Sequence, residues 1–263
     1  MQIGTFARHT DQVKNAIPHE PDFIDLRMDF NYSLDFREVT KMLSDSGISC
    51  TLHLPSDPCW RPMDIAREIV PFVDIGSEIG AELVTCHTAL STLFYSDREI
   101  DEFLESFPLV CDAARERGVK LAVETLGLYY TELSLLLDRC PLIDISLDIG
   151  HGQIMALRNR APGIVQSFYD RIRMANIHDN NGMKMVEEVR QLRNERTVSR
   201  EEMLVIARRY DEHLCIGGGS IDFEPILRDL KQRSYSGRFL MMCKDPSRFP
   251  EERARFMEIW LRA

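Results

Sequence analysis

The chain has 263 residues, of which 44% are hydrophobic and 28% are charged. This balance is typical of a globular protein with enough apolar material for a core, and it disfavours a disordered chain. The excess of 42 acidic over 32 basic residues gives a net charge of -10, which disfavours a duplex-DNA partner because phosphate contacts need a concentrated positive surface. The sequence has neither a basic start followed by a long apolar run nor about 18 consecutive apolar residues, so we expect a cytoplasmic protein without a membrane span.

The length suits one α/β barrel, which typically takes about 250 residues. Eight short apolar runs are typical of strands, and most are followed by a helix-like segment. Eight strand-helix units in this order predict a single domain over residues 1–263, folded as a closed parallel (β/α)8 TIM barrel with right-handed crossovers. The runs are QIGTFA (2–7), FIDLRMD (23–29), ISCTLHLP (48–55), LVTCHTA (83–89), KLAVETL (120–126), IDISLDIGH (143–151), RMANIHD (173–179) and RFLMMCK (238–244).

The clearest helical pattern between these strands covers residues 97–118, where apolar side chains recur on one face. Gly118 is typical of a helix C-terminus. Proline removes a backbone donor, so we expect Pro108 to bend this helix and Pro71 to bend the similar helix predicted over 64–80.

The connection after the seventh strand is longer than a barrel loop needs. Residues 183–210, MKMVEEVRQLRNERTVSREEMLVIARRY, predict a helical insert of two helices broken near Thr197. Ser199 and Glu202 have the spacing of a capping box that opens the second helix. The insert is interpreted as a solvated helix pair, with a lid over the site or an association surface as the alternatives.

Cysteine usage indicates neither a disulfide framework nor a zinc knuckle, because the seven cysteines are odd in number and form no CxxC pair. Cys50, Cys86 and Cys243 lie inside predicted strands. A buried cysteine is more often a small core residue than a ligand, so these three are expected in the core.

The run 143–151 shows most directly where the chemistry is expected. Isoleucine and leucine alternate with Asp144, Ser146 and Asp148, a pattern that predicts a strand with two different faces. Asp148 and His151 fall at its C-terminal end, which is where barrel enzymes carry their active sites.

Other strands end in the same way, and the C-terminal ends of parallel barrel strands meet at one face. Five of the seven histidines fall on this face, together with carboxylates, and this mixture suits zinc or manganese. A polar site without metal is the alternative. No GxSxG elbow, P-loop or GxGxxG motif is present, and Gly217, Gly218 and Gly219 are interpreted as a tight loop near the site. The candidate metal ligands are His53, His87, Glu124, Asp148, His151, His178, Asp211 and His213.

Four motifs, VETLG, SLDIGH, NIHDN and DEHLCIGGGSIDF, resemble the xylose isomerase-like barrels. This family includes sugar isomerases and epimerases as well as nucleases of the endonuclease IV type, and the resemblance covers nearly the whole chain. In the nuclease branch nine residues hold three metal ions, and the eight candidates above match eight of them. The resemblance implies one ion held by His53, His87 and Glu124, a second by Glu124, Asp148 and His178, and a third by His151, Asp211 and His213.

The chain departs from the family pattern at the last strand, where family members usually carry a glutamate in a sequence like VLEVKDP. This chain reads LMMCKDP and has Met242 at that position. A thioether is a poor ligand for zinc or manganese, so the second ion loses an oxygen ligand. In the epimerase branch this glutamate is the acid-base partner opposite the residue that matches Glu124, so two-base epimerisation is threatened. Cys243 could replace it only if the strand were bulged.

The first functional hypothesis is a metal-dependent isomerase or epimerase of a small sugar or sugar phosphate, using one to three divalent ions. Glu124 or His178 would move the proton while the metal binds adjacent substrate oxygens.

The alternative hypothesis is a zinc-dependent endonuclease IV-type apurinic/apyrimidinic endonuclease, the one reading that implies a nucleic acid partner. Phosphate contacts could then come from a set of arginines, although charges at helical spacing usually form a solvated face. A third possibility is a binding barrel that has lost turnover, for which Met242 is the support. No pattern indicates an oligomeric state. The arginines are Arg158, Arg160, Arg190, Arg193, Arg196 and Arg200.

Overall fold

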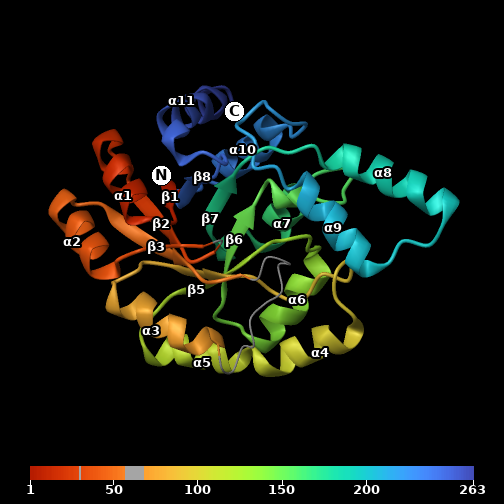
Figure 1. Ribbon diagram of the computed structural model, residues 1–263, viewed down its shortest axis with the longest axis horizontal. Coiled ribbons are helices and arrows are strands. Elements are labelled where there is room, and N and C mark those ends of the chain that lie inside the picture. Colours follow the sequence, from red (N-terminus) through yellow and green to blue (C-terminus); the bar gives the residue numbers. More distant parts are fainter. Residues whose placement is uncertain (30, 57–67) are drawn as a thin grey trace.

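The computed structural model describes residues 1–29, 31–56 and 68–263. Eight parallel strands form a closed barrel in chain order, with helices around the outside (Figure 1). Each strand overlaps its predicted run, so the predicted (β/α)8 TIM barrel is confirmed. The strands are β1 (Gln2–Ala7), β2 (Phe23–Arg27), β3 (Ser49–His53), β4 (Val84–Cys86), β5 (Leu121–Glu124), β6 (Asp144–Asp148), β7 (Ile172–Ile177) and β8 (Arg238–Met241).

The helices lie between and after these strands. None in the described ranges is both long and apolar enough to cross a membrane. They are α1 (Thr10–Ala16), α2 (Phe36–Ser46), α3 (Val70–Glu78), α4 (Asp97–Ser106), α5 (Pro108–Glu116), α6 (Tyr130–Arg139), α7 (Ala161–Phe168), α8 (Gly182–Glu195), α9 (Arg200–Tyr210), α10 (Phe223–Gln232) and α11 (Phe249–Arg262), with short 3-10 turns at Ile17–His19, His151–Gln153, Tyr169–Arg171 and Pro246–Arg248.

One helix prediction needs correction, and a second is described only in part. The single bent helix expected over 97–118 is two helices, because α4 ends at Ser106 and Pro108 begins α5. Proline lacks the N–H that would continue the hydrogen bonds of α4, so it starts a helix here instead of bending one. Pro71 likewise lies in the first turn of α3, and residues 64–67 of the helix predicted there lie outside the described residues.

The insert forms the two predicted helices, α8 and α9, which project from one side of the barrel (Figure 1). The predicted capping box is present: the Ser199 hydroxyl accepts a hydrogen bond from the Glu202 backbone N–H, and the Glu202 carboxylate accepts one from the Ser199 N–H. Glu188 of α8 accepts hydrogen bonds from Arg209 and Tyr210 of α9, both at 2.8 Å. Because α9 ends at Tyr210, the helix pair fixes where the next residues enter the barrel mouth.

The strands carry different side chains on their two faces, as alternation requires. On β6, Ile145 and Leu147 pack in the large core that also contains the helices' apolar residues, while Ser146 and Asp148 hydrogen-bond inside the barrel. A separate apolar cluster fills the barrel interior below the polar ends of the strands. Its members are Phe6, Phe23, Leu83, Ala122, Met174, Leu240 and Met242.

Candidate metal centre

The structure brings all eight predicted ligands together at the C-terminal mouth of the barrel. His53, Glu124 and Asp148 are the last residues of β3, β5 and β6. The others follow β4, β6, β7 and α9. Among the described residues these side chains form three overlapping groups whose candidate ligand atoms lie within 4.8 Å of one another. The groups are His53, His87 and Glu124; His151, His178, Asp211 and His213; and Glu124, Asp148 and His151.

The first group, which we call the β3–β5 group, consists of His53, His87 and Glu124. Glu124 Oε1 lies 3.1 Å from His87 Nε2, and Glu124 Oε2 lies 3.4 Å from His53 Nε2. His53 donates from Nδ1 to the carbonyl oxygen of Leu54 at 2.9 Å, which leaves Nε2, the nitrogen that faces Glu124, as its ligand atom. Two imidazoles and a carboxylate suit a zinc or manganese ion.

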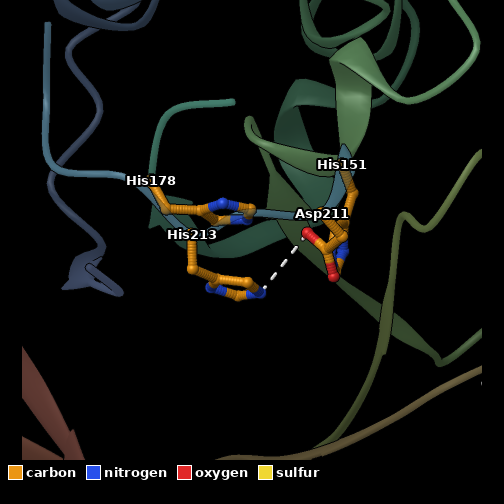
Figure 2. Close-up of side chains that lie close together, drawn as sticks. All are labelled: His151, His178, Asp211 and His213. Carbon is orange, nitrogen blue, oxygen red and sulfur yellow. Dashed lines mark hydrogen bonds and ion pairs between the residues drawn. The ribbon is translucent and has the colours of Figure 1, made fainter. Parts of the chain in front are cut away.

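The second group, which we call the α9-end group, consists of His151, His178, Asp211 and His213 (Figure 2). The rings of His178 and His213 stack with centroids 3.9 Å apart. Asp211 Oδ1 lies 3.3 Å from His151 Nε2 and 3.4 Å from His213 Nε2. His213 donates from Nδ1 to the Met242 carbonyl oxygen, which leaves Nε2 as its ligand atom, and its backbone is left-handed with φ 46°.

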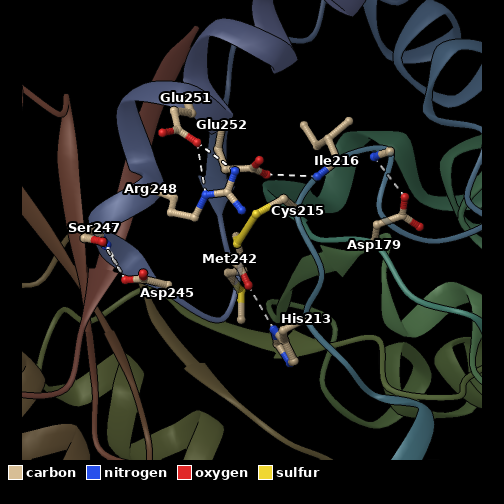
Figure 3. The surroundings of a disulfide bond; sticks show 12 residues. Asp179, His213, Cys215, Ile216, Met242, Asp245, Ser247, Arg248, Glu251 and Glu252 are labelled. Carbon is tan, nitrogen blue, oxygen red and sulfur yellow. Dashed lines mark hydrogen bonds and ion pairs between the residues drawn. A yellow bond between two sulfur atoms is a disulfide. The ribbon is translucent and has the colours of Figure 1, made fainter.

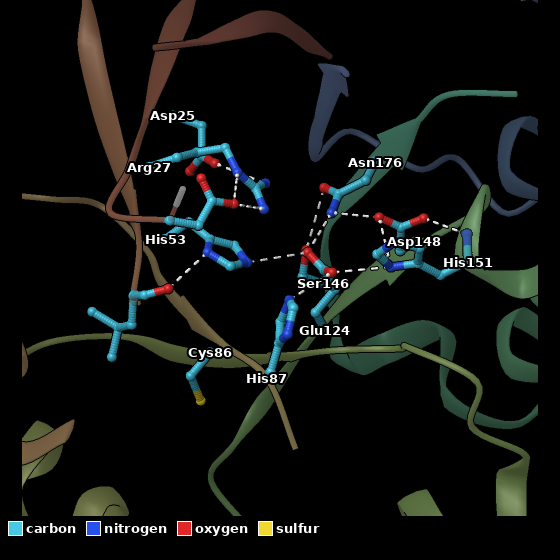
Figure 4. Close-up of polar contacts among 12 residues, drawn as sticks. Asp25, Arg27, His53, Cys86, His87, Glu124, Ser146, Asp148, His151 and Asn176 are labelled. Carbon is cyan, nitrogen blue, oxygen red and sulfur yellow. Dashed lines mark hydrogen bonds and ion pairs between the residues drawn. The ribbon is translucent and has the colours of Figure 1, made fainter. Parts of the chain in front are cut away.

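The third group, which we call the central group, consists of Glu124, Asp148 and His151. The Asn176 amide donates from Nδ2 to Glu124 Oε2 at 3.0 Å and to Asp148 Oδ2 at 3.1 Å (Figure 4). Asp148 Oδ1 accepts from the His151 backbone N–H at 2.7 Å and from His178 Nε2 at 2.9 Å. Three of the four carboxylate oxygens of this group are therefore already hydrogen-bonded by the protein.

Buried atoms without hydrogen bonds show where an ion fits. Within the described ranges they include His53 Nε2, His87 Nε2 and Glu124 Oε1 in the β3–β5 group, and His178 Nδ1 and Asp211 Oδ1 in the α9-end group. His151 Nδ1 is also among them and lies 3.1 Å from Glu124 Oε1. Leaving buried polar atoms unsatisfied is costly, and a bound cation would satisfy them. The donor sets of the β3–β5 and α9-end groups therefore fit divalent ions.

Opposing charges hold this network together. Burial alone would raise the pKa of Glu124, but the neighbouring imidazoles of His87, His151 and His53 outweigh it and hold that pKa well below its usual range. Burial would likewise raise the pKa of Asp211, and His213 and His151 lower it instead. Burial lowers the pKa of His87. The two carboxylates are thus anionic and attract cations.

The opposite side of the mouth holds an arginine cluster that the sequence prediction missed. Arg27, at the end of β2, donates from Nε to Asp29 Oδ2 at 3.0 Å, and its Nη1 lies 3.6 Å from Asp25 Oδ2. Met242 lies beside it, with Sδ 3.5 Å from Arg27 Nη1. Asp25, Arg27 and Asp29 alternate along FIDLRMD, and charges with that period inside a strand-like run were the available signal.

The loop 211–221, which carries Asp211 and His213, is fixed from two sides (Figure 3). Asp179 Oδ2 accepts hydrogen bonds from the N–H groups of Gly217 and Gly219, each at 3.0 Å. A disulfide joins Cys215 to Cys243. This pair corrects the expectation that Cys243 is a plain core residue: it is buried but bonded to a cysteine 28 positions earlier, a pairing that spacing did not indicate.

Gly150 sets the position of His178. A Cβ atom at residue 150 would lie 2.1 Å from His178 Cε1 and 2.2 Å from its Nε2. The imidazole can lie against the turn after β6, within reach of Asp148, because residue 150 has no side chain.

A cavity of about 820 Å³ opens beside the α9-end group. Its wall carries four basic side chains, of which Arg8 is paired with Asp29 and Arg209 with Glu188. The lining residues are Phe6, Arg8, Val205, Arg208, Arg209, Asp211, Glu212, His213, Leu214 and Lys244. In a chain with a net charge of -10, this concentration of cations favours an anionic ligand group.

The predicted arginine set lies elsewhere. Arg158, Arg160 and Arg190 line a different cavity, of about 500 Å³, near Tyr129. Arg160 donates hydrogen bonds to the carbonyl oxygens of Ile154 and Met155, and Arg196 pairs with Glu202. These contacts give Arg160 and Arg196 structural partners.

Comparison with known proteins gives a family match. The family described as Xylose isomerase-like TIM barrel matches residues 15–262. An uncharacterized protein of Methanocaldococcus jannaschii is 23% identical over 176 residues, which is 65% of this chain and 57% of that relative, so the match spans little more than half of the relative's length.

Solved structures share the fold. A D-tagatose 3-epimerase-like protein has a TM-score of 0.72 and 19% identity, covering 98% of this chain and 97% of its own. The IOLI protein with a binding zinc atom has a TM-score of 0.73 and 14% identity, covering 100% and 99%. A D-allulose 3-epimerase from Methylomonas sp., in complex with D-allulose, has a TM-score of 0.68 and 13% identity, covering 98% and 96%.

Proposed function

Because the chain belongs to the xylose isomerase-like TIM barrel family, we propose that it is a divalent-metal-dependent isomerase of a small sugar or sugar phosphate. The observation that carries the proposal is the convergence of eight imidazole and carboxylate side chains on one barrel mouth. The zinc atom of the IOLI protein and the sugar bound to the D-allulose 3-epimerase, both structures of the same fold, support it. Zinc or manganese is the expected ion.

The ion would be held by the β3–β5 group or the α9-end group. When bound, it would polarise adjacent substrate oxygens and stabilise the negative charge that develops there. Glu124 is the proposed base: its buried carboxylate is anionic and lies on the floor of the mouth. His178, whose Nε2–H is fixed by Asp148, is the second candidate for moving a proton.

The residues opposite Glu124 favour isomerisation over two-base epimerisation. Inverting a carbon needs a second acid-base group on its other face. Met242 cannot accept a proton, and neighbouring Asp29, Glu124 and Asp25 outweigh burial and raise the pKa of Arg27, which keeps its proton. A single base can instead move a proton between adjacent carbons on one face, and with transfer of the hydroxyl proton between the two oxygens this interconverts an aldose and a ketose.

The basic cavity favours a phosphorylated substrate. Lys244 and Arg8 lie on its wall together with Asp211 and His213 of the α9-end group, so an anion held there would lie beside the proposed ions. Ammonium and guanidinium groups are the usual phosphate partners.

The test is a panel of aldoses, ketoses and their phosphates, incubated with zinc- or manganese-loaded protein in deuterated water. We expect conversion between an aldose and its ketose, with deuterium incorporated at the carbon that receives the proton. Epimers without aldose–ketose exchange would contradict the isomerase proposal. Glu124→Gln is the matched variant and is expected to abolish the exchange.

Phosphodiester hydrolysis remains the second candidate, because two adjacent groups that fit ions are typical of two-metal hydrolases. Cleavage of an abasic duplex by zinc-loaded protein, lost in Glu124→Gln, would favour it. The structural partners of Arg160 and Arg196 weaken the proposed phosphate contacts.

A further inference from the structure

We infer that the protein binds two divalent ions, one in the β3–β5 group and one in the α9-end group, and none in the central group, because the guanidinium of Arg27 lies beside Met242, the position from which β8 would supply a ligand. This inference rests on the proposed metal dependence and differs from the three ions that the family resemblance implies.

The first step concerns the side chain at the end of β8. Met242 is 1% exposed and its Sδ contacts Arg27 Nη1. A carboxylate at this position could ligate an ion in the central group, whereas a thioether is a poor ligand for zinc or manganese. Cys243 cannot replace it because its sulfur is bonded to Cys215. The central group therefore lacks a ligand from β8.

The second step is that Arg27 is a fixed cation. Its side chain is 4% exposed and lies between Asp25 and Asp29, which are also buried. Arg27 Nη1 also lies 3.5 Å from Met242 Sδ, so the guanidinium occupies the side of the mouth where β8 ends. An arginine does not deprotonate, and breaking a buried pair of this kind leaves costly unpaired charge. Arg27 thus holds a permanent positive charge beside Met242, and a cation bound to a ligand at that position would be repelled.

The third step is that the central carboxylates already have donors. The Asn176 amide bridges Glu124 Oε2 and Asp148 Oδ2, and Asp148 Oδ1 holds the His178 Nε2–H. This last contact gives Asp148 the role of an outer partner that orients a histidine ligand through its second nitrogen. An ion in the central group would have to displace these bonds.

The fourth step is the contrast with the other groups. The buried atoms of the described chain that make no hydrogen bond include His53 Nε2, His87 Nε2 and Glu124 Oε1 on one side, and His178 Nδ1 and Asp211 Oδ1 on the other. His151 Nδ1 is also among these atoms, but it lies 3.1 Å from Glu124 Oε1, its neighbour in the central group. The unsatisfied atoms with no such partner inside the central group belong to the β3–β5 and α9-end groups. The geometry assigns one ion to each.

The test is the number of ions per chain, measured by elemental analysis after zinc loading and desalting of the whole protein. We expect two ions for the wild type, one for His87→Ala and one for His213→Ala. Asp148→Asn is the deciding variant: it removes a central carboxylate but keeps an amide oxygen that can accept from His178 Nε2–H, so the α9-end group is retained and the count is expected to stay at two. Three ions in the wild type, or a loss of one in Asp148→Asn, would overturn the inference.

A variant that is expected to bind an additional ion complements the variants that are expected to lose one. In Met242→Glu, Arg27 pairs with the new carboxylate and the count stays at two. Arg27→Gln combined with Met242→Glu removes the guanidinium and adds a ligand, and we expect three ions; a count of two in a variant with wild-type circular dichroism contradicts the role of Arg27. Met242→Leu is the matched control, and we expect it to bind two ions per chain.

The outcomes separate this inference from the proposed function. Two ions without aldose–ketose conversion would keep the metal assignment and reject the isomerase. Aldose–ketose conversion by a protein with three ions would support the isomerase and reject the two-ion assignment. A protein with no ion after loading would reject both the metal assignment and the metal-dependent isomerase.

Discussion

The two sides of the barrel mouth both bury carboxylates, and they differ in the source of the positive charge that compensates them. On the side of β3 to β7, buried imidazoles and carboxylates leave ligand atoms unsatisfied and fit exchangeable cations. On the side of β8, β1 and β2, the carboxylates of Asp25 and Asp29 form ion pairs with the guanidinium groups of Arg27 and Arg8. The comparison teaches that buried carboxylates alone do not indicate a metal site: what distinguishes the sides is whether the protein places an arginine beside them.

Among substitutions on the metal-binding side, Glu124→Gln is expected to cause the largest loss of turnover. Glu124 contacts both histidines of its group and is the proposed base, so we expect turnover to fall by roughly 10²–10⁴-fold, the usual contribution of a general base. Steady-state kinetics with saturating zinc measures this. Glu105→Gln, on the exposed surface of α4, is the control and should retain wild-type turnover. Equal loss in both variants would refute the role of Glu124.

The disulfide between Cys215 and Cys243 links the two sides of the mouth. The Cys215–Cys243 disulfide ties the loop 211–221 to the end of β8, and we expect Cys215→Ser to lower the free energy of unfolding by about 2–4 kcal/mol under oxidising conditions. Denaturant unfolding measures the change. Reductant should lower the stability of the wild type to that of the variant and leave the variant unaffected. A wild type insensitive to reductant would contradict the expectation.

A ligand substitution on the α9-end group should have a smaller effect on stability. An ion present at 100 times its dissociation constant stabilises the folded state by about 2.7 kcal/mol, and His213→Ala should lose that increment. Thermal unfolding with and without zinc measures it. His19→Ala, an exposed histidine distant in sequence from the candidate ligands, should keep the full zinc-dependent shift. A full shift in His213→Ala would remove His213 from the ligand set.

The smallest expected effect is at the basic wall. Lys244→Ala should raise KM for a phosphorylated sugar by about tenfold, or about 1.4 kcal/mol, with kcat unchanged, because it removes an interaction distant from the reacting carbons. The unphosphorylated sugar is the internal control, and Lys184→Ala on α8 is the matched variant. An equal rise in KM for both sugars would argue against phosphate recognition by Lys244.

The barrel could be predicted because each strand has its own local signal, and because parallel closure forces the ends of distant strands to one face. His53, Glu124 and Asp148 were placed at strand ends by that rule alone. The partition into groups could not be predicted, since it depends on which donor reaches which oxygen, as Asn176 does for Glu124 and Asp148. The disulfide was missed because spacing along the chain does not reveal that the loop after α9 and the end of β8 meet.

The contact between Gly150 and the His178 ring has a consequence for mutational tolerance. Gly150 offers no ligand, proton or charge, yet any larger residue there must displace a proposed ligand. In a substitution scan scored by metal retention, residue 150 should be as intolerant as the histidines themselves. A scan of this barrel would therefore report the shape of the site as well as its chemistry.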